Sequence, residues 1–84
     1  MILHKYNDPG HGWAKIQRAV LIKLGVIDQI SHYSYQRGEF VYLEEDCDLG
    51  VLGDKLKERG EELVIRHHFA DKTSKIRGYA SFAI

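Results

Sequence analysis

Residues 31–48, SHYSYQRGEFVYLEEDCD, decide how this chain of 84 residues folds. Apolar and aromatic side chains alternate with polar ones here, which is the period of a half-buried strand. This pattern therefore predicts two strands, at residues 30–35 and 40–45. Residues 36–38 predict a compact hairpin connection between these strands, in which Gly38 is free to take the left-handed conformation.

Similar patterns extend outward from this hairpin, bounded by glycines and turn residues. The further predicted strands are residues 2–6, 11–16, 63–69 and 79–84, and the predicted helices are residues 17–24 and 49–59. We expect Asp46 or Asp48 to cap the second helix, because a side-chain oxygen there can accept from free backbone amides. Gly50 and Gly53 weaken that helix, which suggests that another segment packs close to it.

The element order predicts a single α+β domain over residues 1–84. Short connections favour a small, mainly antiparallel sheet with two helices packed on one face. The order (β)βαββαβ(β) contains the element sequence of the ferredoxin-like motif. An exposed sheet edge in a domain of this size would predict a homodimer.

Composition limits the functional classes. Twelve basic and twelve acidic residues leave no net charge, so no field over the whole surface attracts nucleic acid or membrane. No apolar run approaches the length of a membrane span, and we expect no membrane partner. The single cysteine permits no internal disulfide, which predicts a reducing, cytoplasmic setting.

Metal binding and covalent catalysis are not predicted, and neither is a cofactor. The adjacent His67 and His68 point to opposite faces of a strand, and the five histidines have no metal-ligand spacing. Cys47 lies between two aspartates that disfavour its thiolate, so we interpret it as a small buried residue at the helix start. The acidic run from Glu44 to Asp48 is interpreted as a strand end followed by a capped helix.

The basic segment 66–77 and the tyrosines suggest a ligand-binding surface, because arginines pair with anions and aromatic rings stack on planar groups. The candidate ligand-binding residues are Tyr33, Tyr35, Arg37, Tyr42, Arg66, His68, Arg77 and Tyr79. The alternative is that the tyrosines are cross-strand packing partners and the basic residues form a solvated face.

Several segments together resemble short proteins encoded by bacteriophages, prophages and mobile elements. These segments are DPGHGWAKI, ISHYSYQRGEFVYLEEDCDL and SKIRGYAS. The resemblance supplies no catalytic residues. It implies the cytoplasm of an infected host cell, where small accessory proteins occlude a host defence protein or sequester a nucleotide signal.

The sequence therefore favours a small non-enzymatic binding protein, whose partner is a host or defence protein or an anionic small molecule. One alternative is a hydrolase or nuclease that uses His11, His67 or His68 with the carboxylates of Glu45 and Asp46. The other is a nucleic-acid-binding module built on the basic segment 66–77, against which the zero net charge counts.

Overall fold

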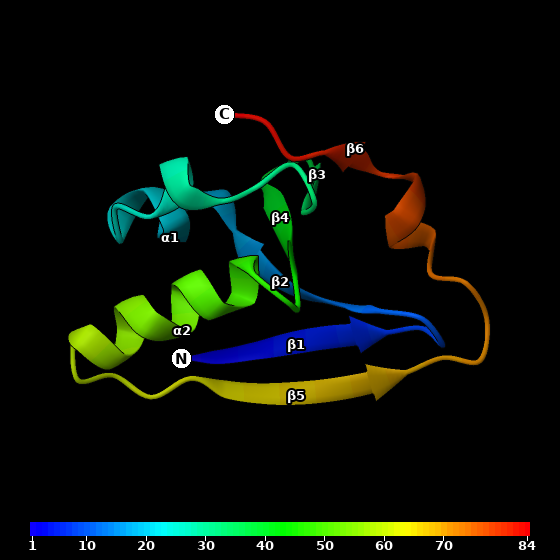
Figure 1. Ribbon diagram of the computed structural model, residues 1–84, viewed down its shortest axis with the longest axis horizontal. Helices are drawn as coiled ribbons and strands as arrows, with labels where there is room; N and C mark the ends of the chain where they lie inside the picture. Colours follow the sequence, from blue (N-terminus) through cyan, green and yellow to red (C-terminus); the bar gives the residue numbers. More distant parts are fainter.

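A computed structural model describes residues 1–84 (Figure 1). The strands are β1 (Ile2–Asn7), β2 (Gly12–Gln17), β3 (Tyr35–Arg37), β4 (Phe40–Glu44), β5 (Val64–Phe69) and β6 (Ala80–Ser81). The α-helices are α1 (Arg18–Lys23) and α2 (Asp48–Glu58), and the short 3-10 helices are η1 (Ile27–Gln29) and η2 (Lys75–Gly78). Neither α-helix has the length and apolar character needed to cross a membrane. The predicted α+β class is confirmed.

All strands belong to one mixed sheet with the order β5-β1-β2-β4-β3-β6. The β1–β5 pair is parallel and the other pairs are antiparallel. The ferredoxin-like order is not confirmed, because β1 lies between β2 and β5. The tight turn after Asn7 folds β1 back onto β2, so β1 occupies the edge of β2 that the last strand would take in that motif.

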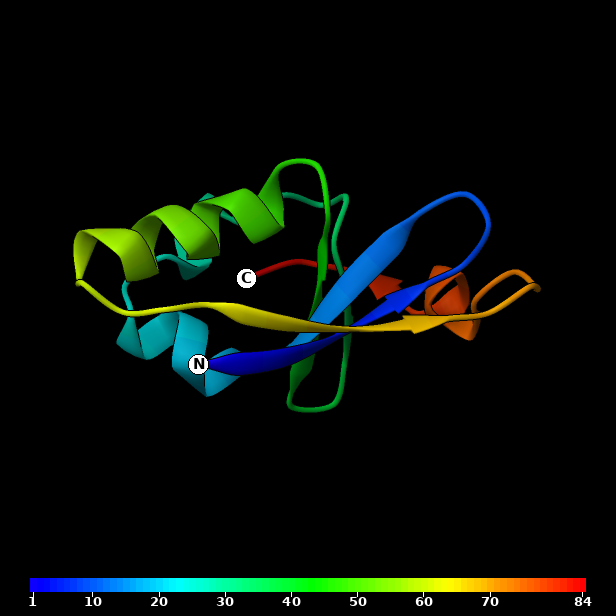
Figure 2. The same ribbon diagram turned by 90° about the horizontal axis from the view of Figure 1, so that it is seen from below.

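The two faces of the sheet pack differently. Ala14 and Ile16 on β2 and Val41 and Leu43 on β4 belong to one buried cluster. The buried leucines of both α-helices join the same cluster, and they are Leu21, Leu24, Leu52 and Leu56. Both α-helices lie at one end of the molecule, away from η2, in Figures 1 and 2. Because side chains alternate along a strand, the residues of β2 and β4 next to these point to the opposite face of the sheet.

The opposite face carries a smaller aromatic cluster. Trp13, Tyr42 and Ile76 are buried in it, at 2%, 7% and 4% exposure. Ile76 belongs to η2, so this short helix covers part of the sheet face that the α-helices do not cover. Tyr6, Tyr35, Phe40 and Tyr79 are partly buried against the same cluster.

Two predicted strands are wrong in extent. Residues 31–34 form a turn instead of strand, because Ser31 accepts the backbone amide of Tyr33 through its hydroxyl and the amide of Ser34 through its carbonyl. At the other end, only Ala80 and Ser81 pair with β3. The amide of Phe82 still bonds to the carbonyl of Ser34, but its side chain enters the main core.

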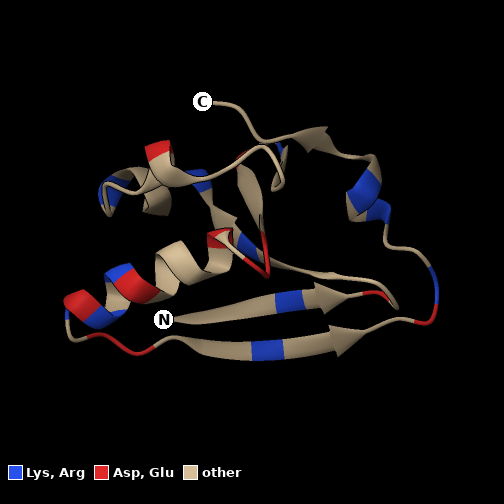
Figure 3. Cartoon of the chain, in the orientation of Figure 1, with Lys and Arg blue, Asp and Glu red and all other residues tan.

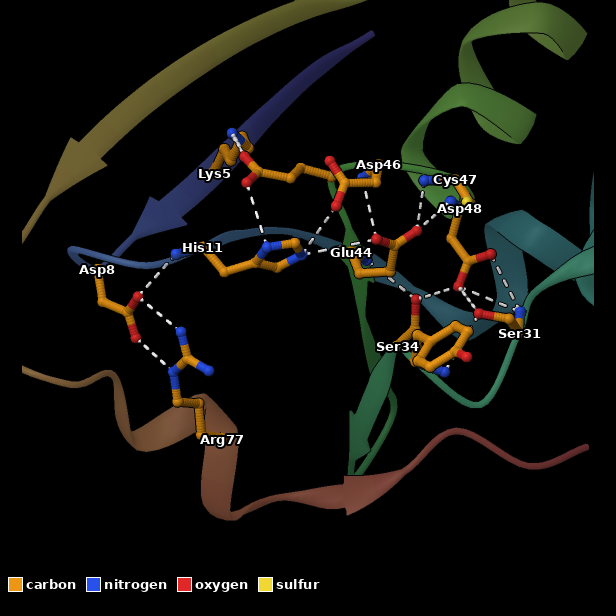
Figure 4. A network of polar contacts seen from close by, with 12 residues as sticks. Lys5, Asp8, His11, Ser31, Ser34, Glu44, Asp46, Cys47, Asp48 and Arg77 are labelled. Atoms are coloured by element: carbon orange, nitrogen blue, oxygen red, sulfur yellow. Dashed lines mark hydrogen bonds and ion pairs between the residues drawn. The ribbon is translucent and has the colours of Figure 1, made fainter.

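The start of α2 is held by a residue that the sequence did not predict as a cap. The Glu44 carboxylate accepts the backbone amides of Asp46, Cys47 and Asp48 at 2.9, 2.5 and 2.6 Å (Figure 4). Asp48 instead accepts hydrogen bonds from Ser31 and Ser34. The expected burial of Cys47 is also wrong, because its side chain is exposed.

Candidate ligand-binding site

A pocket of about 660 Å³ opens between the β3–β4 hairpin and η2. The β2–β4 pairing places Lys15 beside Tyr42, and the β3–β4 pairing places Arg37 beside Phe40. Its lining residues are Tyr6, Lys15, Arg37, Gly38, Glu39, Phe40, Tyr42, Ser74, Lys75, Ile76 and Tyr79. This volume lies within the range of about 300–1,000 Å³ that is typical of small-molecule sites.

Aromatic rings form one side of the pocket. The rings of Tyr42 and Tyr79 have centroids 5.1 Å apart at an interplanar angle of 56°. Burial raises the pKa of Tyr42 above its ordinary value, and the neighbouring Tyr79 raises it further. Tyr42 therefore stays a neutral phenol at physiological pH, able to donate or accept a hydrogen bond.

Basic side chains flank these rings. The ammonium nitrogen of Lys15 lies 4.1 Å from the centre of the Phe40 ring, and the Arg37 guanidinium lies 5.0 Å from the centre of the Tyr79 ring. Lys75 also lines the pocket, and Glu39 is its one acidic residue. Figure 3 shows the same asymmetry over the molecule: η2 carries only basic charges, whereas the turn before α2 carries acidic ones. The pocket thus has an excess of positive charge beside aromatic surface.

Three predicted ligand-binding residues, Arg37, Tyr42 and Tyr79, line this pocket. Tyr35 is close to it but lies in the packing beneath, where its ring meets the Trp13 ring edge-on at 6.0 Å. The pocket thus brings together Arg37 from β3, Tyr42 from β4 and Tyr79, which directly follows η2.

Arg66 and His68 lie on the same sheet face, beyond β1. The register pairs Arg66 with His4 and His68 with Tyr6. The His68 ring stacks on the Tyr6 ring at 5.0 Å and 18°, and Tyr6 lines the pocket. Neither residue lines the pocket: His68 adjoins it through Tyr6, whereas Arg66 pairs with His4, which is outside the lining.

Arg77 and Tyr33 lie elsewhere. Arg77 donates two hydrogen bonds to Asp8, at 2.7 and 3.0 Å, and its guanidinium lies over the Trp13 ring. Tyr33 is 67% exposed in the turn before β3, where its ring contacts His32. Neither residue lines the pocket.

Sequence reasoning did not single out several residues of the pocket, including Lys15, Phe40 and Lys75, although Lys75 lies in the basic segment 66–77. The period of β4 places Phe40 on the same face as Tyr42, so that signal was present in the sequence. Lys15 is brought in by pairing between strands of two different hairpins, and Lys75 by the packing of η2 against the sheet. Neither of these contacts produces a recognisable pattern in the neighbouring sequence.

The histidines named for a hydrolytic site are dispersed. His11 lies beside Glu45 and Asp46, with nitrogen–oxygen distances of 3.4 and 3.9 Å. His67 instead contacts Asn7 and stacks on the Phe69 ring. His68 faces the other side of β5, where it shares a hydrogen bond with His4. Only His11 therefore meets the predicted carboxylates.

Comparisons of this chain with models of protein families, with curated proteins and with solved structures give no match.

Proposed function

We propose that this protein is a non-enzymatic binding protein whose pocket holds an anionic small molecule with a planar ring, of the nucleotide class. The observation that carries the proposal is the placement of Lys15 and Arg37 over the rings of Phe40 and Tyr79 at the pocket. Guanidinium and ammonium groups bind phosphate oxygens, and adjacent aromatic surface stacks a base.

Packing holds the aromatic rings in place before any ligand binds. Trp13 lies under the pocket, Tyr42 forms part of its wall, and both are almost fully buried. Phe40 and Tyr79 pack against that cluster. Preorganised groups lose less conformational entropy on binding, which favours affinity. In the phage setting that the resemblance implies, tight binding of a nucleotide signal would by itself weaken a host defence.

The direct test is a thermal-shift panel of nucleoside mono-, di- and triphosphates and cyclic nucleotides, each paired with its uncharged nucleoside. A ligand at a hundred times its dissociation constant adds about 2.7 kcal/mol to the free energy of unfolding, which a melting curve resolves. We expect at least one phosphorylated compound to raise the melting temperature while its nucleoside does not.

Arg37→Gln and Lys15→Gln should abolish that shift, and Arg59→Gln is the matched control. Arg59 is an exposed arginine after α2, paired with Glu61 and outside the pocket lining. The proposal is overturned if no compound shifts the wild type and protein purified under native conditions carries no ultraviolet-absorbing ligand. It is also overturned if Arg37→Gln and Arg59→Gln respond equally.

A second candidate is single-stranded nucleic acid, favoured by the stacking of Tyr6 on His68 next to the exposed Arg66. These residues extend the pocket's aromatic and basic character across β1 to β5. An oligonucleotide would then bind with a steep salt dependence, and Arg66→Gln would weaken binding as strongly as Arg37→Gln. If the pocket binds a single nucleotide, Arg66→Gln leaves binding unchanged.

A further inference from the structure

His11 lies among carboxylates at the turn between β4 and α2, on a site separate from the pocket (Figure 4). Its Nε2 atom is 3.6 Å from Oε2 of Glu44 and 3.9 Å from Oδ2 of Asp46. One ligand-type atom from each of these residues lies within 4.8 Å of the others. His11 lies just before β2, Glu44 ends β4 and Asp46 lies in the turn after it, so the pairing of β2 with β4 brings the group together.

The spacing leaves room for an ion between these side chains. A nitrogen–oxygen hydrogen bond spans about 2.7–3.2 Å, and both distances at Nε2, 3.6 and 3.9 Å, exceed it. Ligands about 2.0–2.1 Å from a tetrahedral Zn²⁺ lie roughly 3.3–3.4 Å from one another. The two distances from Nε2 exceed that separation by about 0.2–0.6 Å, and all three ligand atoms lie within 4.8 Å of one another, so modest side-chain movement would let them share one ion.

The other ring nitrogen of His11 faces a carboxylate. Nδ1 lies 3.4 Å from Oε2 of Glu45, slightly beyond the hydrogen-bond range, and Oε1 of Glu45 accepts a hydrogen bond from Lys5 Nζ at 2.5 Å. Histidines that bind metals usually direct their second nitrogen to a carboxylate, which fixes the ring and its tautomer. Gly12 leaves room for the side chains of Asn7 and Lys5, because a Cβ there would meet Asn7 Oδ1 first and come within 2.8 Å of Lys5 Cε.

Glu44 is better positioned for this role than Asp46, whose side chain is 73% exposed. Glu44 is 5% exposed and is held by three backbone amides, so it is already positioned for a ligand. The charge of Glu45 is balanced by Lys5. Glu44 and Asp46 then contribute two negative charges, which a divalent cation neutralises.

We propose that His11, Glu44 and Asp46 bind a divalent transition-metal ion of the Zn²⁺ type, with Glu45 orienting His11. One nitrogen and two carboxylate ligands match the mixed set that Zn²⁺ accepts, whereas Mg²⁺ and Ca²⁺ prefer oxygen ligands alone. Three protein ligands leave a fourth tetrahedral position for water. The proposal does not depend on the nucleotide pocket.

Titration of metal-free protein with Zn²⁺ against a chromophoric chelator tests this site. We expect one saturable site in the wild type, its loss in His11→Gln, and about 10–100-fold weaker binding in Glu45→Gln, which removes only the orienting charge. His32→Gln is the matched control, because His32 is an exposed histidine outside the group. Circular dichroism and melting curves establish that each variant is folded.

Tryptophan fluorescence gives an independent measurement. Trp13 is the only tryptophan, and its ring lies 5.4 Å from the His11 ring. Co²⁺ bound at His11 should quench this emission in the wild type and in His32→Gln, but not in His11→Gln. The proposal is overturned if Zn²⁺ shows no saturable binding or if folded His11→Gln binds with wild-type affinity. It is overturned equally if Cys47→Ser or His68→Gln removes the site.

Discussion

Asp8 and Arg77, which are 69 positions apart, form a two-point ion pair that ties the first hairpin turn to η2. Arg77 Nε donates to Oδ2 at 2.7 Å and Nη2 donates to Oδ1 at 3.0 Å. The Asp8 side chain is 2% exposed, and it also accepts the backbone amide of Ser74 at 3.0 Å. Because η2 forms part of the pocket wall, this pair fixes one side of the candidate site.

Arg77→Gln should lower the melting temperature, because it leaves a nearly buried carboxylate without its charged partner. Arg77→Lys should rescue only part of the loss, since a lysine cannot reproduce the two-point contact or the stacking over Trp13. The measurement is thermal unfolding, with the exposed Lys72→Gln as control. Equal melting temperatures for Arg77→Gln and Lys72→Gln would contradict this role.

The same pair should make stability depend on pH. The hydrogen bond from Arg77, and then that from the Ser74 amide, holds the pKa of Asp8 well below its usual range. The pair therefore contributes fully above the pKa of an unfolded aspartate, about 3.9, and its contribution falls as acid protonates Asp8.

Urea unfolding of the wild type and Asp8→Asn at several pH values measures this contribution. The wild type should be the more stable protein at pH 7, and its advantage should shrink steadily below about pH 4. A difference that stays constant down to pH 2 would show that the charge of Asp8 is not what stabilises the turn.

Local patterns predicted most elements of the fold but not their arrangement. The turn after Asn7, the hairpin at Gly38 and the helix end at Gly60 depend on nearby residues, and both glycines have positive φ, 59° and 72°. The parallel pairing of β1 with β5 joins segments about sixty residues apart, and nothing within either strand encodes it. Local patterns therefore predicted the α+β class but could not predict the order of the strands in the sheet.

The candidate sites likewise contain some residues that local patterns predict and others that only the folded structure brings together. Arg37 and Tyr42 share a face of one hairpin, which the alternation at residues 35–42 predicts. Arg77 is an arginine in a basic segment, and only the structure shows that its charge is already used by Asp8. His11 also has no local pattern, because its neighbours Glu44 and Asp46 come from another strand end. Charge and residue type are visible in a sequence, but pairing between distant segments is not.

Gly50 gives a prediction of increased stability. The sequence suggested close packing around it, but a Cβ added there would meet no atom within 4 Å. Its φ is not positive, so alanine fits the helical conformation without strain. Gly50→Ala should stabilise the protein by about 0.5–1 kcal/mol, because glycine loses more backbone entropy in a helix.

Gly60→Ala is the informative comparison for that experiment. Gly60 ends α2 with φ of 72°, where alanine is strained, so this variant should be less stable than the wild type. Both changes are measured by chemical unfolding. A loss of stability in Gly50→Ala would mean that α2 is packed more closely than its surroundings indicate.

Ser34 joins the hairpin to α2 through a hydroxyl that has no access to solvent. The hydroxyl donates to Asp48 Oδ2 at 2.5 Å and accepts the backbone amide of Glu44 at 3.0 Å, and the side chain is fully buried. Ser34→Ala leaves a buried donor without a partner and removes one donor from a buried carboxylate. Each such loss costs about 1–3 kcal/mol, so the variant should be clearly destabilised.

The free energy of unfolding in urea measures this effect, and Ser81→Ala is the control because Ser81 is exposed on β6. A double-mutant cycle with Asp48→Asn separates the contact from general damage. If the bond between Ser34 and Asp48 is the cause, the two losses will not add. If the two losses of stability add strictly, Ser34 acts only through its bond to the Glu44 amide. Ser31, which also bonds to Asp48, would then be the residue that links the turn before β3 to the start of α2.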